Sequence, residues 1–224
     1  MKKLFIVAIA MMAAVTANAQ FEPGTLSIQP RIGGTGSMFT NAPKLTFSGM
    51  RSDVDATAIG GAIIGADFEY QMSDAASFSI GANWAMAGSG WKDFNYNGVD
   101  VKDLKIETSY INIPVLLNYY LFRGFAVKAG IQPGFLTSAK YKATAEAKEG
   151  GVTAKVEYDE DCKNQFKKFD LSIPVGVSYE FPVPIVLDLR FNFGLFKVNK
   201  ETYEGYKDSR NMSAAFTVGY KFAL

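Results

Sequence analysis

Residues 169–181 read FDLSIPVGVSYEF. Every odd-numbered position in this stretch carries an apolar or aromatic side chain, and the even-numbered positions carry mainly small or acidic residues. A period of two is typical of a β-strand with one apolar face. The stretch also exceeds the roughly 9–11 residues that a tilted strand needs to cross a bilayer.

Seven further runs share this alternation, and no apolar run after residue 20 is long enough for a membrane helix. Eight strands is an even number, and the smallest found in single-chain outer-membrane barrels. Pro114 and Pro174 fall within such runs and are expected at bulges, because proline removes a hydrogen-bond donor from the sheet. The seven runs are 26–32, 62–70, 78–86, 111–119, 125–131, 185–193 and 212–222.

The connections between the runs alternate in length. Long links at 34–57, 87–105, 138–168 and 197–211 alternate with short ones at 71–76, 122–124 and 182–184. Transmembrane barrels have long extracellular loops and short periplasmic turns in this order. The predicted fold is therefore all-β, an eight-stranded antiparallel transmembrane β-barrel of outer-membrane type with both termini in the periplasm.

Aromatic residues distinguish this fold from a soluble lipocalin-like barrel, whose alternation looks similar. Eight aromatic side chains lie on the apolar face of the runs, near their short-turn ends. Such a girdle is typical of the membrane interface. Its predicted members are Tyr70, Phe78, Tyr119, Phe125, Tyr179, Phe181, Tyr220 and Phe222.

The N-terminal segment has the features of a cleavable signal peptide. Lys2 and Lys3 precede an apolar run at 4–15, and Ala17 and Ala19 form a small-residue cleavage site. We expect residues 1–19 to be removed and residues 20–224 to form the outer-membrane barrel of an exported protein. Gln20 rather than a cysteine follows the cleavage site, so a lipid anchor is not expected.

The composition excludes several classes of function. The 224 residues contain no His and one Cys, with 23 Lys+Arg against 22 Asp+Glu. A His zinc site, a His general base and a disulfide framework are excluded, and balanced charge gives no footprint for nucleic acid. We predict no enzyme activity and no catalytic, metal or cofactor site. The acidic groups Asp53 with Asp55, and 159–161, are interpreted as loop surface.

The opposite face of the runs carries charges that would point into the barrel. An eight-stranded barrel is only wide enough for side chains to fill it, and buried charges need partners. We therefore expect a plug of ion pairs, or alternatively a proton or ion path, with glycines such as Gly81 and Gly176 making room. The predicted network comprises Arg31, Asp67, Glu69, Lys128, Glu180, Asp188, Arg190 and Lys221.

The loops are the candidates for binding. The segments 140–148 and 152–159 alternate around Gly150 and Gly151, which predicts a hairpin that continues two strands above the membrane. Its edge could pair with another protein, or the hairpin could fold over the barrel mouth. The candidate partner-binding residues are Tyr141, Val152, Val156 and Tyr158.

Two other loop features leave alternatives open. Trp91, Phe94 and Tyr96 could stack on a sugar, although a packed loop is the simpler interpretation. Cys162, which we expect in an exposed loop, could form an intermolecular disulfide or be an incidental thiol.

The segment from Tyr110 to Tyr120, followed by 124–130, resembles the PorT-like and OmpX-like outer-membrane β-barrel proteins typical of the Bacteroidota. The similarity extends through Phe169 and Asp170, residues 188–192 and the closing 219–222. The sequence departs from the family at two positions: Asn112 stands where the family commonly has an acidic residue, and Asn118 stands where it commonly has a basic one. PorT is associated with protein secretion, so the resemblance implies a barrel and a possible link to secretion.

These observations favour a structural or interaction protein, alone or as an accessory subunit of a secretion or barrel-assembly complex. A narrow channel for small solutes or ions is the alternative, and a soluble ligand carrier is a remote third. The expected partners are outer-membrane lipid, lipopolysaccharide and other envelope proteins, with no nucleic acid.

Overall fold

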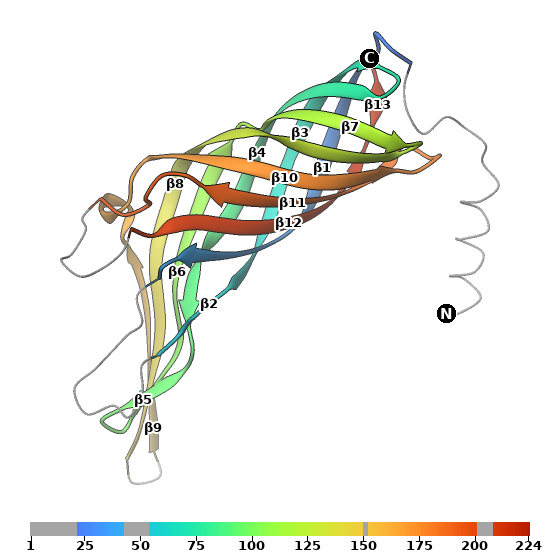
Figure 1. Cartoon of the computed structure of the whole chain (residues 1–224). Coiled ribbons are helices and arrows are strands. Elements are labelled where there is room, and N and C mark those ends of the chain that lie inside the picture. Colours follow the sequence, from blue (N-terminus) through green and yellow to red (C-terminus); the bar gives the residue numbers. More distant parts are fainter. Residues whose placement is uncertain (1–21, 43–53, 150–151, 201–207) are drawn as a thin grey trace, which may run out of the picture.

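The computed structural model describes residues 22–42, 54–149, 152–200 and 208–224 (Figure 1). The predicted signal peptide lies outside these residues. No helix in the described ranges is long and apolar enough to cross a bilayer. The elements in chain order are β1 (Leu26–Thr40), β2 (Ala56–Thr57), β3 (Ile59–Ser73), β4 (Ala76–Trp91), β5 (Phe94–Tyr96), β6 (Val99–Asn112), β7 (Val115–Phe122), β8 (Phe125–Glu149), β9 (Val152–Asp161), the 3-10 helix η1 (Lys163–Gln165), β10 (Phe169–Glu180), β11 (Ile185–Gly194), β12 (Arg210–Tyr220) and β13 (Phe222–Ala223).

The strands close into an antiparallel ring. Its order is β10-β11-β12-β1-β3-β4-β7-β8, and β8 pairs back with β10. β6 and β7 occupy one position in the ring, because both pair with β4 on one side and β8 on the other. The ring therefore has eight strands, as the sequence predicts (Figure 1).

The two prolines do not lie at bulges, so that expectation was wrong. Pro114 separates β6 from β7, yet β8 keeps its register across the break, from Asn112↔Gly134 to Val115↔Ile131. The neighbouring backbone stays paired, because Gly81 N donates to Pro114 O over 2.9 Å. Pro174 likewise keeps its place opposite Asn192 in the ladder between β10 and β11. Interrupting the pairing locally is enough to accommodate the missing donor.

The two ends of the ring differ. At one end, which we call the turn end, short links join β3 to β4, β7 to β8 and β10 to β11. At the other end much of what the sequence predicts as loop is strand, because β1 reaches Thr40, β4 reaches Trp91 and β8 reaches Glu149. Parts of these long strands leave the barrel together and project beyond it (Figure 1).

The apolar side chains of the wall point outward. Ile32 on β1 and Leu117 on β7 are 62% and 61% exposed, whereas Gln29 and Asn118 on the same strands are 1% and 2% exposed. This is the reverse of a soluble barrel, whose apolar residues point inward. The outward apolar surface identifies lipid as the surrounding medium of the wall.

Gly81 on β4 shows how closely the interior is packed. It lies opposite Asp67 on β3, and a Cβ atom built on Gly81 would clash with Asp67 Oδ1. We expect Gly81→Ala to lower the free energy of unfolding by about 1–3 kcal/mol, because the added methyl must displace a buried carboxylate. Urea titration of the barrel refolded into lipid vesicles measures this change.

Gly36→Ala is the matched control, since a Cβ there meets no described atom within 4 Å. Its unfolding midpoint should be no lower than that of the unmodified protein, because alanine loses less backbone entropy on folding than glycine does. Equal midpoints for Gly81→Ala and Gly36→Ala would contradict the packing described above.

Candidate functional site

The barrel interior contains two separate groups of charges. The first, which we call the turn-end cluster, consists of Lys221, Glu69, Glu180 and Tyr120. Lys221 Nζ lies 3.0 Å from Glu69 Oε1 and 2.7 Å from Glu180 Oε1. The Tyr120 hydroxyl lies 2.7 Å from each of the same two oxygens. One ammonium and one hydroxyl thus join two carboxylates from opposite parts of the wall.

The second group, the central cluster, contains Arg31, Asp67, Lys128, Asp188 and Arg190. Arg190 bridges the two aspartates, with Nη2 2.6 Å from Asp67 Oδ2 and Nε 2.7 Å from Asp188 Oδ1. Arg31 Nε lies 3.0 Å from Asp67 Oδ2, and Lys128 Nζ lies 2.9 Å from Asp188 Oδ2. Planar guanidinium groups suit such bridging, because they present several donors in a fixed geometry.

The structure places all eight residues of the predicted interior network inside the ring, each at most 6% exposed. It divides them into a group of three charges and a group of five. The turn-end cluster has one cation and two anions, and the central cluster has three cations and two anions. Each group has a net formal charge of one unit, of opposite sign, so the two together are neutral.

Amide side chains and one further carboxylate, that of Asp170, occupy the next part of the interior. Asn112 Nδ2 donates to Asn83 Oδ1 over 3.1 Å, and Asn211 Nδ2 donates to Asp170 Oδ2 over 2.7 Å. A polar cavity of about 50 Å³ lies here, lined by these residues together with Arg31 and Arg190. Nearer the turn end, Asn118 Nδ2 donates to Ser77 Oγ over 2.9 Å. Asn112 and Asn118 therefore make neutral hydrogen bonds where the resembled family commonly has charges.

An apolar cluster lies at the extension end of the barrel. It forms from β1, β6, β8, the segment around η1 and the link after β11, and its rings Phe39 and Phe166 have centroids 6.1 Å apart. We call it the apolar lid. Its buried members are Phe39, Tyr110, Leu136, Ala139, Cys162, Phe166 and Val198.

The expectation that Cys162 lies exposed in a loop was wrong. Its side chain packs in the apolar lid and the residue is 8% exposed. Burial, and then the neighbouring Asp161, raise the pKa of the Cys162 thiol. A buried thiol with a raised pKa is a poor nucleophile, which argues against an intermolecular disulfide.

The apolar lid is not among the features predicted from the sequence, although part of its pattern is present there. Tyr110 has the same parity as inward Asn112, and Leu136 the same parity as inward Gln132. Continuing the alternation past the expected strand ends would have found both. Phe166 and Val198 lie outside the regular strands, so no periodicity could have placed them.

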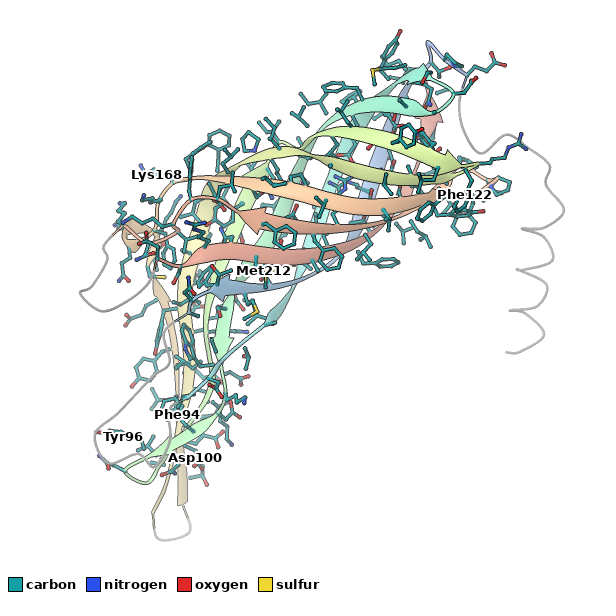
Figure 2. The ribbon with its side chains drawn as sticks, in the orientation of Figure 1. Phe94, Tyr96, Asp100, Phe122, Lys168 and Met212 are labelled. Carbon is teal, nitrogen blue, oxygen red and sulfur yellow. The ribbon has the colours of Figure 1, made fainter. Side chains whose placement is uncertain are left out.

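The eight predicted interface aromatics lie on the outer surface near the turn end. Six of them are 38–55% exposed, and Phe125 and Phe181 are half-buried. Several rings pack in pairs, such as Phe122 with Phe125 at 4.8 Å and Tyr220 with Phe222 at 4.5 Å between centroids. Figure 2 shows Phe122 at the end of the barrel opposite Lys168.

A second aromatic group, which the sequence analysis did not identify, lies on the outer surface toward the extension end. The rings of Phe135 and Phe169 have centroids 5.5 Å apart, and Phe169 and Phe196 6.0 Å apart. All three are exposed. The wall thus has aromatic side chains toward both ends of its apolar surface, as membrane barrels do.

The projecting strands form one continuous sheet, which we call the extension. Its order is β5-β6-β8-β9, and β8 pairs with β6 as far as Val99↔Ala147. A small apolar core fixes it on one face, with Trp91, Val54, Leu104 and Ala143 all buried. Phe94 packs against this core, so Trp91 and Phe94 follow the packed-loop interpretation, while Tyr96 is half-buried outside the core. Figure 2 shows Phe94, Tyr96 and Asp100 on the extension, away from the barrel wall.

The predicted hairpin exists as β8 and β9, and it projects rather than covering the barrel mouth (Figure 1). Three of its four candidate partner-binding side chains are exposed, namely Tyr141 at 39%, Val156 at 50% and Tyr158 at 47%. Val152 begins β9 opposite Glu149, and the structure describes its backbone but not its side chain.

The face of the extension that lies opposite the Trp91 core carries charges of alternating sign. Glu107 accepts from Lys105 over 2.8 Å and from Lys142 over 2.6 Å. Lys102 pairs with Glu146 over 2.8 Å in the same way. Such partly exposed pairs contribute little to stability, so the charged face mainly keeps the sheet soluble.

The loop carboxylates do not converge on a metal site. Asp55 pairs with Lys92 over 3.4 Å and Asp159 with Lys140 over 3.0 Å, while Asp53 lies outside the described residues. Among the residues that the structure describes, no three His, Cys, Asp or Glu side chains gather in a way that could hold a metal ion.

Comparison with known families gave a match over most of the chain. Residues 18–200 match the model of the outer membrane protein beta-barrel domain. The chain belongs to this family. Its membership, together with the outward apolar surface, places the protein in the outer membrane. A comparison with curated proteins found no match.

Solved structures that are similar to this chain include three at 13–15% sequence identity. The attachment invasion locus protein Ail of Yersinia pestis is 13% identical, with a TM-score of 0.42, over 90% of this chain and 100% of that one. OprG of Pseudomonas aeruginosa is 15% identical, with a TM-score of 0.42, over 92% of this chain and 99% of that one. Neisserial surface protein A is 13% identical, with a TM-score of 0.41, over 88% of this chain and 97% of that one.

The turn-end cluster makes Lys221 a sensitive position. We expect Lys221→Met to lower the free energy of unfolding by about 3–5 kcal/mol, because two buried carboxylates lose their cation. Adding Glu69→Gln and Glu180→Gln should restore part of that loss, since the uncompensated charges are then gone. Urea titration in vesicles measures both changes. A triple variant less stable than Lys221→Met would show that the ion pairs do not explain the loss.

Proposed function

We propose that this outer-membrane barrel is closed to solutes and acts as an interaction protein through its extension. On this proposal the wall is a rigid membrane anchor, and the sheet formed by β5, β6, β8 and β9 is the working surface. The observation that carries the proposal is the extension itself, an ordered sheet continuous with the barrel that presents exposed Tyr141, Val156 and Tyr158.

The filled interior supports the first part of the proposal. A solute entering from the turn end meets the turn-end cluster, then the central cluster, and the apolar lid lies beyond them. These groups come from strands all around the ring, so no single side-chain movement would open a passage. Opening one would also separate buried charges, which costs several kcal/mol per pair.

The geometry of the extension supports the second part. Its hydrogen-bonded strands and its small core hold the surface in one conformation. A preorganised surface loses less entropy on binding than a flexible loop does. Exposed tyrosine side chains on such a surface are typical of protein contacts.

We further propose that the protein works as an accessory subunit of an envelope complex, such as one for secretion or barrel assembly. The resemblance to PorT-like barrels supports this role. On the same proposal the signal peptide is cleaved after Ala19, the turn end faces the periplasm, and the extension faces outward. Lipid and lipopolysaccharide then surround the wall between its two aromatic groups.

A narrow channel for small ions is the alternative function. The polar cavity of about 50 Å³ beside Arg31 and Arg190 favours it, because a cavity of this size holds a few water molecules. No chemistry beyond conduction is proposed, since a chain without His offers no imidazole base.

Planar-bilayer recording separates the two functions. We expect the refolded protein to be silent, because both charge clusters occupy the lumen. Discrete openings in the unmodified protein that disappear in Arg190→Gln or Asp188→Asn would instead support the channel.

Affinity purification from cross-linked cells in mild detergent tests the interaction role. The full chain should retain a defined partner. A shortened variant, in which Lys142 is joined to Asp159 through Asn-Gly, should lose it, because the exposed hairpin surface is removed.

A matched control joins Ala147 to Ala154 through Asn-Gly, which removes only the hairpin tip. This control should retain the partner. Equal recovery of the partner by both shortened variants would contradict a role for the hairpin surface.

A further inference from the structure

β9 is an open edge of the extension. It pairs with β8 over ten residue pairs without a register shift, from Lys140↔Asp161 to Glu149↔Val152. Within the described part of the chain, no strand pairs with its other side. Residues 153–160 are all exposed. The backbone groups on this side therefore face solvent.

Such an edge is unusual for its length. Proteins commonly protect exposed edges with short strands, prolines, bulges or charged side chains, above all lysine, because an unprotected edge pairs with other chains. β5, at the opposite edge of the extension, is only three residues long. β9 has ten residues, contains no proline and no bulge, and carries a single lysine, Lys155.

The charge of β9 restricts what can pair with it. Glu157, Asp159, Glu160 and Asp161 against Lys155 give this strand a net charge of −3 (one positive and four negative). The two faces also differ, since exposed Val156 and Tyr158 lie on one face and the alternate positions, including Glu157 and Asp159, on the other. A strand that matched this edge would have apolar residues on one face and basic residues on the other.

We propose that β9 binds an extended basic segment of another protein by strand addition. The segment alternates apolar residues with Lys or Arg, and its backbone completes the open side of β9. This inference rests on the proposed function and specifies its partner.

Charge argues against a second copy of this chain as the occupant. Two β9 edges would bring a net charge of −3 each into one sheet, and like charges opposite each other destabilise strand pairing. A basic strand would share Glu157 with Lys155, which lies 2.7 Å away, and Asp159 with Lys140, which lies 3.0 Å away; both pairs are exposed and therefore weak. The acidic edge thus disfavours self-association while remaining open to a partner.

The test uses the full chain in lipid nanodiscs and a fluorescent ten-residue peptide that alternates Lys and Val. We expect saturable binding by fluorescence anisotropy. Two control peptides should bind at least about tenfold more weakly, because each removes one component of the match. One has five Lys followed by five Val, and the other alternates Glu and Val.

Charge reversal on the protein tests the inference more strictly than the control peptides do. Glu157→Lys with Asp159→Lys should exchange the preference, so that the Glu-Val peptide binds and the Lys-Val peptide does not. The matched control, Asp93→Lys with Asp100→Lys near the opposite edge, changes charge equally and should keep the original preference. Gain of binding to the acidic peptide also shows that the reversed strand is folded.

Three results would overturn the inference. They are equal binding of the alternating and block Lys-Val peptides, an equal effect of both charge reversals, and dimers of the unmodified protein that form through β9. If the peptides fail but partner recovery still depends on the hairpin, strand addition is wrong while the proposed interaction role stands.

Discussion

The interior of an eight-stranded barrel is only as wide as the side chains that fill it, and charges placed there can be compensated only by one another. This chain places four cations and four anions of the predicted network inside the ring. Because Asp67 and Asp188 share Arg190, and Glu69 and Glu180 share Lys221, the charges join strands that are far apart in sequence. The same contacts that neutralise the interior therefore hold the wall closed.

The alternation of side chains along the strands has one consequence in the barrel wall and another in the extension. In the wall it separates a lipid-facing surface from the polar interior. Above the wall, the strands that continue into β6 and β8 use the same alternation to separate a small apolar core from a charged face. The extension needs no domain of its own, because its strands begin inside the barrel. The register between β6 and β8 shifts beside Ser109 and again between Lys102 and Lys105, and the alternation resumes after each shift.

Much of this architecture could be predicted from the sequence. The strand number, the ring and the inward position of residues such as Asp188 and Lys128 follow from a period of two combined with alternating link lengths. The ends of the strands could not be predicted, because the extension keeps alternating above the membrane where long loops were expected. Cys162 was misplaced for a related reason, since its burial depends on contacts with Phe39 and Phe166 that are distant in sequence. The pairing of the interior charges could not be predicted from the sequence either, because it depends on how far each strand is shifted along the barrel axis relative to its neighbours.

The central claim is that the ion pairs of the interior hold the barrel together, and a double-mutant cycle on Arg190 of β11 and Asp67 of β3 tests it most directly. The measurement is the free energy of unfolding in lipid vesicles for the unmodified protein, Arg190→Met, Asp67→Asn and the double variant. The account predicts a coupling energy of about 2–3 kcal/mol, because the two groups join two strands by direct contact and are both buried. Additive effects of the two substitutions would contradict it.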